Sequence, residues 1–302
     1  MGVAWQAGND EGPDAMAVKL DDLNAMPAPD FAAALDGIFE DAPWVAGQAA
    51  AARPFATVTA LHAAMLDAVR AAPPGQVAAF LRGHPELSGA AALAGTMADA
   101  SAAEQRALGL DRPAEDMAAL NAAYRARFGL PFIVCVRRHT RSSLLQEFRR
   151  RLALDPAAEQ ATALEEVGRI TRLRLVDRVE GPGAPVVHGS LTTHVLDAAV
   201  GRPAAGVAVA LFEVGSGTPA PLATAVTDAQ GRTARPLLHG APLRIGLYEL
   251  RFEVGGYFAG SAPGQPPFLD TIPVRFGIAE AEAHYHIPLL VSPGAYSTYR
   301  GS

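Results

Sequence analysis

The 302-residue sequence contains almost no cysteine and almost no lysine. Cys135 is the only cysteine, which excludes an internal disulfide, a Cys-x-x-Cys pair and a cysteine-rich zinc cluster. Lys19 is the only lysine, and we attribute the use of arginine in its place to a GC-rich genome rather than to function. With a single thiol, the cytoplasm is the expected location.

Long apolar runs and a surplus of positive charge are also missing. No stretch reaches about 18 uninterrupted apolar residues, and the first residues lack the basic and apolar regions of a secretory signal. The formal net charge is −6 without a dense basic stripe, so we expect neither a nucleic-acid nor a membrane partner. Half of the residues are hydrophobic, which is typical of a folded protein, and 302 residues indicate two domains.

The first half of the chain has the periodicity of helices. Between about residues 58 and 175 apolar residues recur every three or four positions, as in Val58, Leu61 and Met65. Stop and start signals such as Gly129 and Asp155 divide this region, and we expect six or more helices. The apolar segment 130–136 between two of them fits a strand or a buried connector equally well.

The second half has the periodicity of strands. Residues 177–187 lose the helical pattern and gain glycine and proline, which predicts a linker. Beyond it apolar and polar residues alternate, as around Leu250, which predicts one antiparallel β-sandwich. The expected fold is an N-terminal all-α helical bundle followed by a C-terminal all-β sandwich. The predicted segments are a disordered tail (1–18), a helical domain (19–176), the linker (177–187) and the sandwich (188–302).

Four motifs stand in the predicted sandwich. They are LTTHVLD at 191–197, DAQGR at 228–232, HYHIPLL at 284–290 and the tetrapeptide Tyr-Arg-Gly-Ser at 299–302. Together they resemble the 5-hydroxyisourate hydrolases, transthyretin-like enzymes of urate breakdown. The resemblance implies a catalytic set and a group of substrate-binding residues. The catalytic set is His194, Arg232, His286 and Ser302, and the binding residues are Tyr299, Arg300 and Gly301.

The residue types in this set suit hydrolysis. Opening a cyclic amide needs a base that positions water, a cation and a donor for the developing oxyanion. In a strand, His284 and His286 project to one face, so His286 can join His194 only where the two strand faces converge. A lone histidine in a strand is more often a packed residue, and the joint match of four motifs decides for function. His284 is a neighbour, because the family motif places its histidine directly before Ile-Pro-Leu-Leu.

Six motifs stand in the helical half. They are FEDAPWVAG at 39–47, RPF at 53–55, GHPEL at 83–87, SAAEQ at 101–105, LNAAYRARFGLPFIVCVR at 120–137 and ITRLRL at 170–175. Their order resembles the 2-oxo-4-hydroxy-4-carboxy-5-ureidoimidazoline (OHCU) decarboxylases, from about Leu23 to Leu175. The resemblance implies His84 as the catalytic acid/base, Glu104 as its partner carboxylate and Arg174 as an anion clamp. It further implies a pocket lining of Pro85, Ser101, Gln105, Phe132 and Ile133.

These residues suit decarboxylation. Loss of CO2 leaves electron density on a ring carbon, and a histidine with a pKa near 6.5 can deliver a proton to one face of it. A neighbouring carboxylate stabilises the charged form of that histidine, and an arginine can bind a carboxylate bidentately. Without the resemblance, Arg174 would pass for a surface arginine. Glu86 departs from the aspartate common in the family, and His62 and His139 lack a motif and are expected to be structural.

The sequence therefore predicts a bifunctional enzyme of urate degradation. One domain would hydrolyse 5-hydroxyisourate to OHCU and the other would decarboxylate OHCU to S-allantoin. No metal or organic cofactor is expected, since the chain has no phosphate-binding or dinucleotide motif. The resemblance implies a homo-oligomer with tetrameric sandwich and dimeric helical domains, which binds small-molecule substrates. The alternatives are a transthyretin-like ligand-binding or scaffold protein and a chain with only one active domain.

Overall fold

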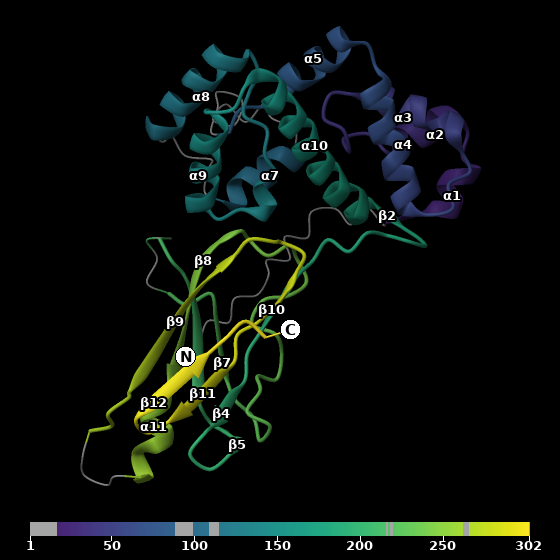
Figure 1. Ribbon diagram of the computed structural model, residues 1–302. Helices are drawn as coiled ribbons and strands as arrows, with labels where there is room; N and C mark the ends of the chain where they lie inside the picture. Colours follow the sequence, from purple (N-terminus) through teal and green to yellow (C-terminus); the bar gives the residue numbers. More distant parts are fainter. Residues whose placement is uncertain are drawn as a thin grey trace. The chain divides into compact units, whose positions relative to one another are not determined.

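A computed structural model describes residues 17–87, 99–108, 115–215, 217, 220–261 and 266–301. The chain forms two compact units, which we treat separately (Figure 1). Among the described residues, a helical unit is formed within 12–137 and 144–187, and a β unit by 138–143 with 188–301. The predicted disordered tail falls mostly on residues outside the described ranges, although Val18 belongs to a strand.

The described residues of the helical unit form two main hydrophobic cores and a small third cluster of Cys135, Leu173 and Val187. The larger is built around α1–α5 and α10, and a second lies around α8 and α9, where the rings of Phe132 and Phe148 stack. The helices are α1 (Leu20–Ala25), α2 (Ala28–Ala34), α3 (Pro43–Ala49), α4 (Val58–Ala71), α5 (Pro74–Gly83), α7 (Asp99–Ala107), α8 (Glu115–Phe128), α9 (Arg141–Arg151) and α10 (Pro156–Arg178).

Local signals in the sequence explain where the long helix α10 begins. The Asp155 side chain accepts hydrogen bonds from the backbone N–H groups of Ala157 and Ala158, and Pro156 occupies the first helical position. Helix α4 is capped in the same way by the Thr57 hydroxyl. Between α8 and α9 the apolar segment 130–136 contains no strand and is buried from residue 131 to residue 136. The connector interpretation of this segment is therefore the correct one.

The predicted linker is partly bound to the helical unit. Helix α10 continues to Arg178, and β2 (Val179–Glu180) then pairs in parallel with β1 (Val18–Lys19). The backbone N–H of Val58 donates to the carbonyl of Pro182 at 2.9 Å, and the Thr59 hydroxyl donates to the carbonyl of Gly183 at 2.6 Å. Residues 177–183 are therefore not free chain, because the end of α10, the strand β2 and the turn at Pro182 and Gly183 are each held by hydrogen bonds within the helical unit.

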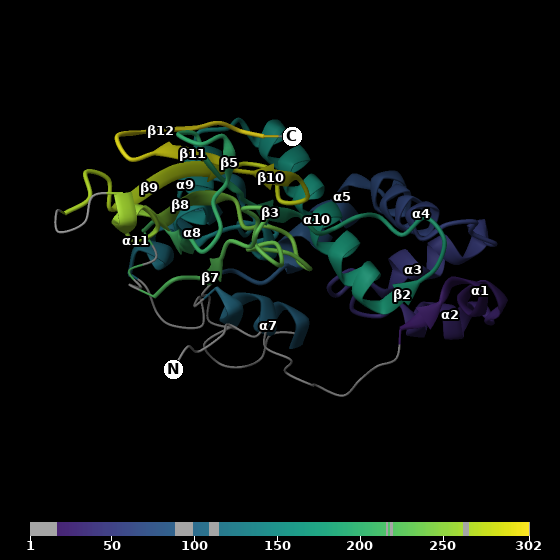
Figure 2. The same ribbon diagram turned by 90° about the horizontal axis from the view of Figure 1, so that it is seen from below.

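The β unit is built from two four-stranded sheets and one strand pair. Their orders are β7-β6-β8-β9, β12-β11-β4-β5 and β10-β3, and Figure 2 shows β12 beside β11. The elements are β3 (Ser190–Thr192), β4 (Val195–Asp197), β5 (Arg202–Pro203), β6 (Ala208–Glu213), β7 (Ala223–Val226), β8 (Gly246–Glu253), α11 (Val254–Phe258), β9 (Thr271–Ile278), β10 (His284–His286), β11 (Leu289–Ser292) and β12 (Ala295–Thr298).

Inward-facing residues of both four-stranded sheets belong to one core, in which Leu211 and Phe252 lie with Val195 and Leu289. This is the arrangement of a layered β domain. The prediction of a purely antiparallel sandwich is wrong, because β11 pairs with β4 and β10 with β3 in parallel. Alternation along a strand indicates which face is buried, but it does not indicate the direction of the neighbouring strand.

Candidate functional site

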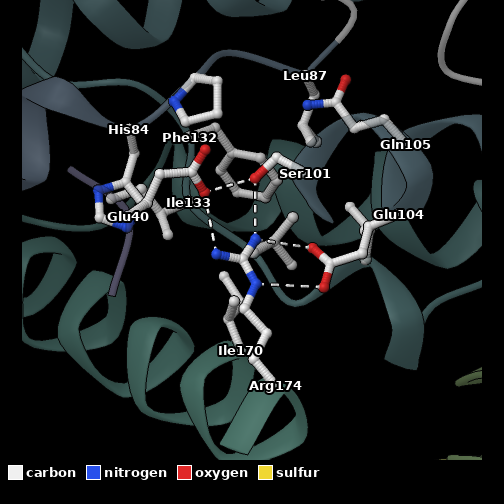
Figure 3. Close-up of a pocket in the computed structure, with 13 residues that line it drawn as sticks. Glu40, His84, Leu87, Ser101, Glu104, Gln105, Phe132, Ile133, Ile170 and Arg174 are labelled. Carbon is white, nitrogen blue, oxygen red and sulfur yellow. Dashed lines mark hydrogen bonds and ion pairs between the residues drawn. The ribbon is translucent and has the colours of Figure 1, made fainter. Parts of the chain in front are cut away.

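One cavity of the helical unit collects every residue that the sequence predicts for a site in this half (Figure 3). Ser101, Glu104 and Gln105 share one face of α7, since they stand three and four positions apart. His84 caps the C-terminal end of α5, and Arg174 reaches in from α10. The cavity is lined by Glu40, His84, Pro85, Leu87, Ser101, Glu104, Gln105, Phe132, Ile133, Val134, Val136, Ile170 and Arg174.

Arg174 is the centre of a buried ion network. Its guanidinium donates to Glu40 Oε2 at 3.1 Å, to Ser101 Oγ at 2.9 Å and to Glu104 Oε2 at 3.1 Å. The Ser101 hydroxyl in turn donates to Glu40 Oε2 at 2.5 Å. The Arg174 side chain is only 9% exposed, which excludes the reading as a surface arginine. Charge-assisted bonds to two carboxylates fix the orientation of the guanidinium.

The carboxylate beside His84 is Glu40, whereas the sequence predicts Glu104. Glu104 presents both oxygens to Arg174, and in Figure 3 it lies on the far side of that guanidinium from His84. Burial lowers the pKa of His84; the Phe80 carbonyl and the charges of Glu40 and Asp41 act to raise it, while Arg174 lowers it further. The net direction is downward, so the imidazole is neutral at pH 7 in the substrate-free pocket.

The tautomer of His84 follows from its one hydrogen bond. Nδ1 lies 3.0 Å from the backbone carbonyl of Phe80, and a carbonyl oxygen can only accept. Nδ1 therefore carries the proton of the neutral ring, and Nε2 presents a lone pair. Among the described residues Nε2 has no hydrogen-bond partner. The ring can thus act as a base at Nε2.

Sequence reasoning missed one charged lining residue, Glu40, and the buried Arg151 behind the wall, besides four apolar lining residues, Leu87, Val134, Val136 and Ile170. Glu40 lies inside a quoted motif, but it stands directly before a second acid, Asp41, and the pattern did not distinguish the two. Arg151 is fully buried with Glu159; it donates to the carbonyl of Ile133 at 2.7 Å and lies 4.6 Å from the ring centroid of Phe132. The buried ion pair of Arg151 and Glu159 therefore supports the pocket wall, and none of the motifs predicted it.

The departure at Glu86 does not touch the cavity. Its carboxylate pairs with Arg125 at 2.7 Å, and it is not among the lining residues. His62 and His139 are buried outside both sites. Nε2 of His62 lies 2.9 Å from the Thr171 hydroxyl, and Nδ1 of His139 lies 3.1 Å from the Ser143 hydroxyl. These contacts account for both histidines as structural residues.

Two predicted histidines of the β unit meet directly. Nδ1 of His194 lies 2.8 Å from Nε2 of His286, and the two rings stack with centroids 4.9 Å apart. His194 also forms a backbone bridge with Arg232. Burial lowers the pKa of both histidines, and the Arg232 charge lowers both further. Both rings are therefore neutral at pH 7.

The second nitrogen of His286 is engaged as well. Nδ1 lies 2.8 Å from the hydroxyl of Thr192, and that hydroxyl lies 2.8 Å from Nε2 of His284. His284 and His286 thus share one face of β10, as the alternation predicts. Thr192 was not among the predicted site residues, although it lies inside the first motif.

The terminal tetrapeptide returns to the same place. The backbone N–H of Gly301 donates to the carbonyl of His286 at 2.9 Å, and a Cβ at position 301 would come within 2.6 Å of the His286 ring. Arg300 lies over the ring of Tyr285, with its Cζ 4.8 Å from the centroid, and Tyr299 is 55% exposed. The predicted catalytic Ser302 lies outside the described residues.

The described part of the chain contains no group of three or more His, Cys, Asp or Glu side chains arranged to hold a metal ion. Within the same ranges no helix has both the length and the apolar character to cross a membrane.

Known families match each unit. The sequence model of the OHCU decarboxylase family matches residues 24–176, and that of the HIUase/Transthyretin family matches residues 191–301. The chain belongs to both families. The 5-hydroxyisourate hydrolases of Ralstonia nicotianae and Deinococcus radiodurans are 52% and 51% identical to it over 116 residues each, which is 38% of this chain and 99% and 98% of those proteins.

Matches that span both units also exist. The "Uric acid degradation bifunctional protein TTL" of Arabidopsis thaliana is 29% identical over 238 residues, which covers 62% of this chain and 71% of that protein. A solved structure described as (S)-allantoin synthase is 35% identical and covers 94% of this chain and 100% of its own, with a TM-score of 0.49. This OHCU decarboxylase and HIUase fusion thus has relatives that match the β unit alone and a relative that spans both units.

Proposed function

We propose that the chain is a bifunctional enzyme of urate degradation, in which the β unit hydrolyses 5-hydroxyisourate to OHCU and the helical unit decarboxylates OHCU to S-allantoin. The observation that carries the proposal is that the predicted site residues of each unit lie together in the structure. Residues from α5, α7, α10 and the segment after α8 meet in one cavity of the helical unit. In the β unit, His194 and His286 meet through the contact between Nδ1 of the first and Nε2 of the second.

In the proposed hydrolysis, His194 acts as the base. Both ring nitrogens of His286 are engaged, whereas Nε2 of His194 has no partner in the described part of the chain. Nε2 can take a proton from water as the water oxygen bonds to the acyl carbon. Arg232 then stabilises the developing oxyanion, and the acyl–nitrogen bond breaks as the nitrogen is protonated.

Decarboxylation uses His84 as a base and then as an acid. Nε2 takes the proton of the substrate's 4-hydroxyl group, the bond between the ring carbon and the carboxylate breaks, and CO2 leaves. The imidazolium then returns its proton to the adjacent ring carbon, and solvent supplies the one proton that the loss of CO2 from a carboxylate consumes. Glu40 stabilises the transient imidazolium, and delivery from one side gives one enantiomer.

Arg174 and Glu104 act as a unit in this proposal. A guanidinium bonded to two carboxylates presents a fixed pattern of donors and acceptors, which suits the ureido group of the substrate as well as its carboxylate. Phe132 and Ile133 supply part of the apolar wall, and Gln105 and Pro85 also line the cavity.

The proposed assembly is a homo-oligomer with a tetrameric core of β units and dimeric contacts of helical units. A closed symmetric assembly suits a site shared between copies. Light scattering on 188–302 and on the full chain tests this: the isolated β unit must keep the higher-order state. A monomeric and fully active β unit would contradict the shared site. The buried, single Cys135 agrees with the proposed cytoplasmic location.

The direct test generates 5-hydroxyisourate in situ with urate oxidase, adds the protein and follows optical activity. The expected product is S-allantoin alone, formed faster than in a control without the protein. Slowly formed, racemic allantoin would show that neither activity is present.

A further inference from the structure

The contacts of His286 extend beyond the catalytic pair. Three hydrogen bonds of 2.8 Å each join four side chains in a row: His194 Nδ1 to His286 Nε2, His286 Nδ1 to Thr192 Oγ1, and Thr192 Oγ1 to His284 Nε2. His194 and His286 are mostly covered at this site, whereas His284 at the end of the row is exposed. The row therefore leads from the site to the surface of the β unit.

We propose that Thr192 and His284 complete a proton wire that carries a proton from His194 to solvent during hydrolysis. The inference rests on the proposed hydrolase function. The reaction requires that a proton is released to solvent. Water supplies two protons, and the departing nitrogen takes one of them. Because the new carboxylic acid ionises at neutral pH, one proton leaves in each turnover.

The proton count of the row permits this transfer without a charged intermediate. In the starting state Nδ1 carries the proton on all three histidines, and the Thr192 hydroxyl donates to His284 Nε2. When His194 Nε2 accepts a proton, its Nδ1 proton passes to His286 Nε2. The Nδ1 proton of His286 passes to Thr192 Oγ1, the hydroxyl proton passes to His284 Nε2, and His284 releases its Nδ1 proton to solvent. Each group ends with the number of protons it had, but at its other position. When His194 Nε2 then protonates the departing nitrogen, the same transfers run in reverse from solvent and restore the starting tautomers, and the ionising carboxylic acid gives the one net proton released.

The charges around His194 and His286 favour passing the proton on over holding it on either ring. Burial lowers the pKa of both histidines; the Arg232 charge lowers the pKa of His194 further, and the charges of His194, Arg232 and His284 lower that of His286 further. No carboxylate of the described residues acts on either ring in the opposite direction. An imidazolium is therefore costly at this site, and a concerted transfer along neutral groups avoids it.

Thr192→Val and Thr192→Ser form a matched pair of tests. Valine keeps the shape but removes the hydroxyl, so kcat for hydrolysis is expected to fall by about 10- to 100-fold with KM nearly unchanged. Serine keeps the hydroxyl, and its kcat is expected to stay within about threefold of the original. Far-UV circular dichroism and thermal unfolding of each variant report whether the β unit, which holds Thr192, remains folded. Equal rates for the two variants would overturn the wire.

His284→Ala gives a second, independent readout. Without the last member, transfer to solvent needs an external base, so kcat becomes dependent on buffer concentration and is restored by added imidazole, whereas the original chain is insensitive to both. A residue with a merely structural role would not produce this dependence. If the original chain hydrolyses the substrate but His284→Ala shows no buffer dependence, the wire is wrong. If the original chain does not hydrolyse it, the proposed function itself fails.

Discussion

The two sites handle a proton by different means. In the helical unit His84 is buried beside Glu40 and Asp41, whose charges partly offset the effect of burial on its pKa. In the β unit His194 and His286 face Arg232 and each other, and every neighbouring charge adds to the effect of burial. The difference matches the two reactions. In the proposed mechanisms, decarboxylation returns the proton to the same substrate and the site holds it briefly, whereas hydrolysis releases a proton and the site passes it on.

The largest effect is expected from breaking the ion network of the helical unit. Arg174→Met leaves Glu40 and Glu104 without their cation in a buried site, which typically costs about 3–5 kcal/mol and would abolish decarboxylation. Hydrolysis by the β unit should persist. Urea unfolding followed by circular dichroism, together with the two assays, measures both effects. Arg70→Met is the control, since Arg70 pairs with Asp67 at a position 67% exposed and should change neither.

Removing the base of the helical site should separate chemistry from stability. His84→Gln is expected to lower kcat for decarboxylation by about 10²- to 10⁴-fold while the fold and the hydrolysis remain, so that OHCU accumulates. Chromatography of the reaction mixture detects the intermediate. Persistence of 5-hydroxyisourate in this variant would show that the two sites are not independent.

The carboxylate beside His84 can be identified by titration. Glu40→Gln removes a charge that raises the His84 pKa, so this pKa should fall further, whereas Glu104→Gln should change it less because the Glu104 charge is directed at Arg174. Histidine proton resonances followed by NMR between pH 4 and pH 8 measure this in the substrate-free protein. A larger shift in Glu104→Gln would restore the partner that the sequence predicts.

A structural histidine should make the helical unit sensitive to acid. Burial, with the charges of Arg172 and Arg70, lowers the pKa of His62 to about 4. The unfolded chain binds a proton near pH 6.5 and the folded chain does not, so stability is full above pH 6.5 and falls toward pH 4, by up to about 3 kcal/mol. Urea unfolding at pH 7 and pH 4.5, with helix content as the signal, tests this. His62→Gln should reduce the difference in the free energy of unfolding between the two pH values. An unchanged difference would show that another group causes the loss of stability.

The smallest effect is expected at Glu86, two residues after His84 in the sequence. Glu86→Gln breaks a pair with the half-exposed Arg125, which is worth about 1 kcal/mol or less, and leaves decarboxylation within about twofold. Steady-state rates check this. A large loss would mean that the change from aspartate to glutamate at this position has consequences for the reaction.

Motif order predicted which residues of the helical half meet, because each motif sits at a fixed place on a helix or at its end. It did not predict how they pair. Two adjacent acids precede α3, and their side-chain directions depend on a local backbone that includes a positive φ at Asp41. Glu40 and Glu104 both bind the guanidinium of Arg174, and only the packed structure decides that Glu40 is the one that also lies beside His84.

In the β half, alternation placed His284 and His286 on one face but gave no information on partners. Thr192 meets both histidines because β3 and β10 pair in parallel with Thr192 opposite His286. Pairing of strands far apart in sequence depends on the whole core, so a threonine in a familiar motif could not be recognised as a link between two histidines.

Gly301 limits how this protein can change over evolution. Even alanine at this position would press its methyl group against the His286 ring, which is held by hydrogen bonds at both nitrogens. While selection maintains the histidine, position 301 therefore accepts only glycine. A descendant that no longer needs hydrolysis is released from both requirements together. Among relatives with this fold we expect the glycine and the histidine to be kept or lost as a pair, and frequent loss of one alone would contradict the steric link.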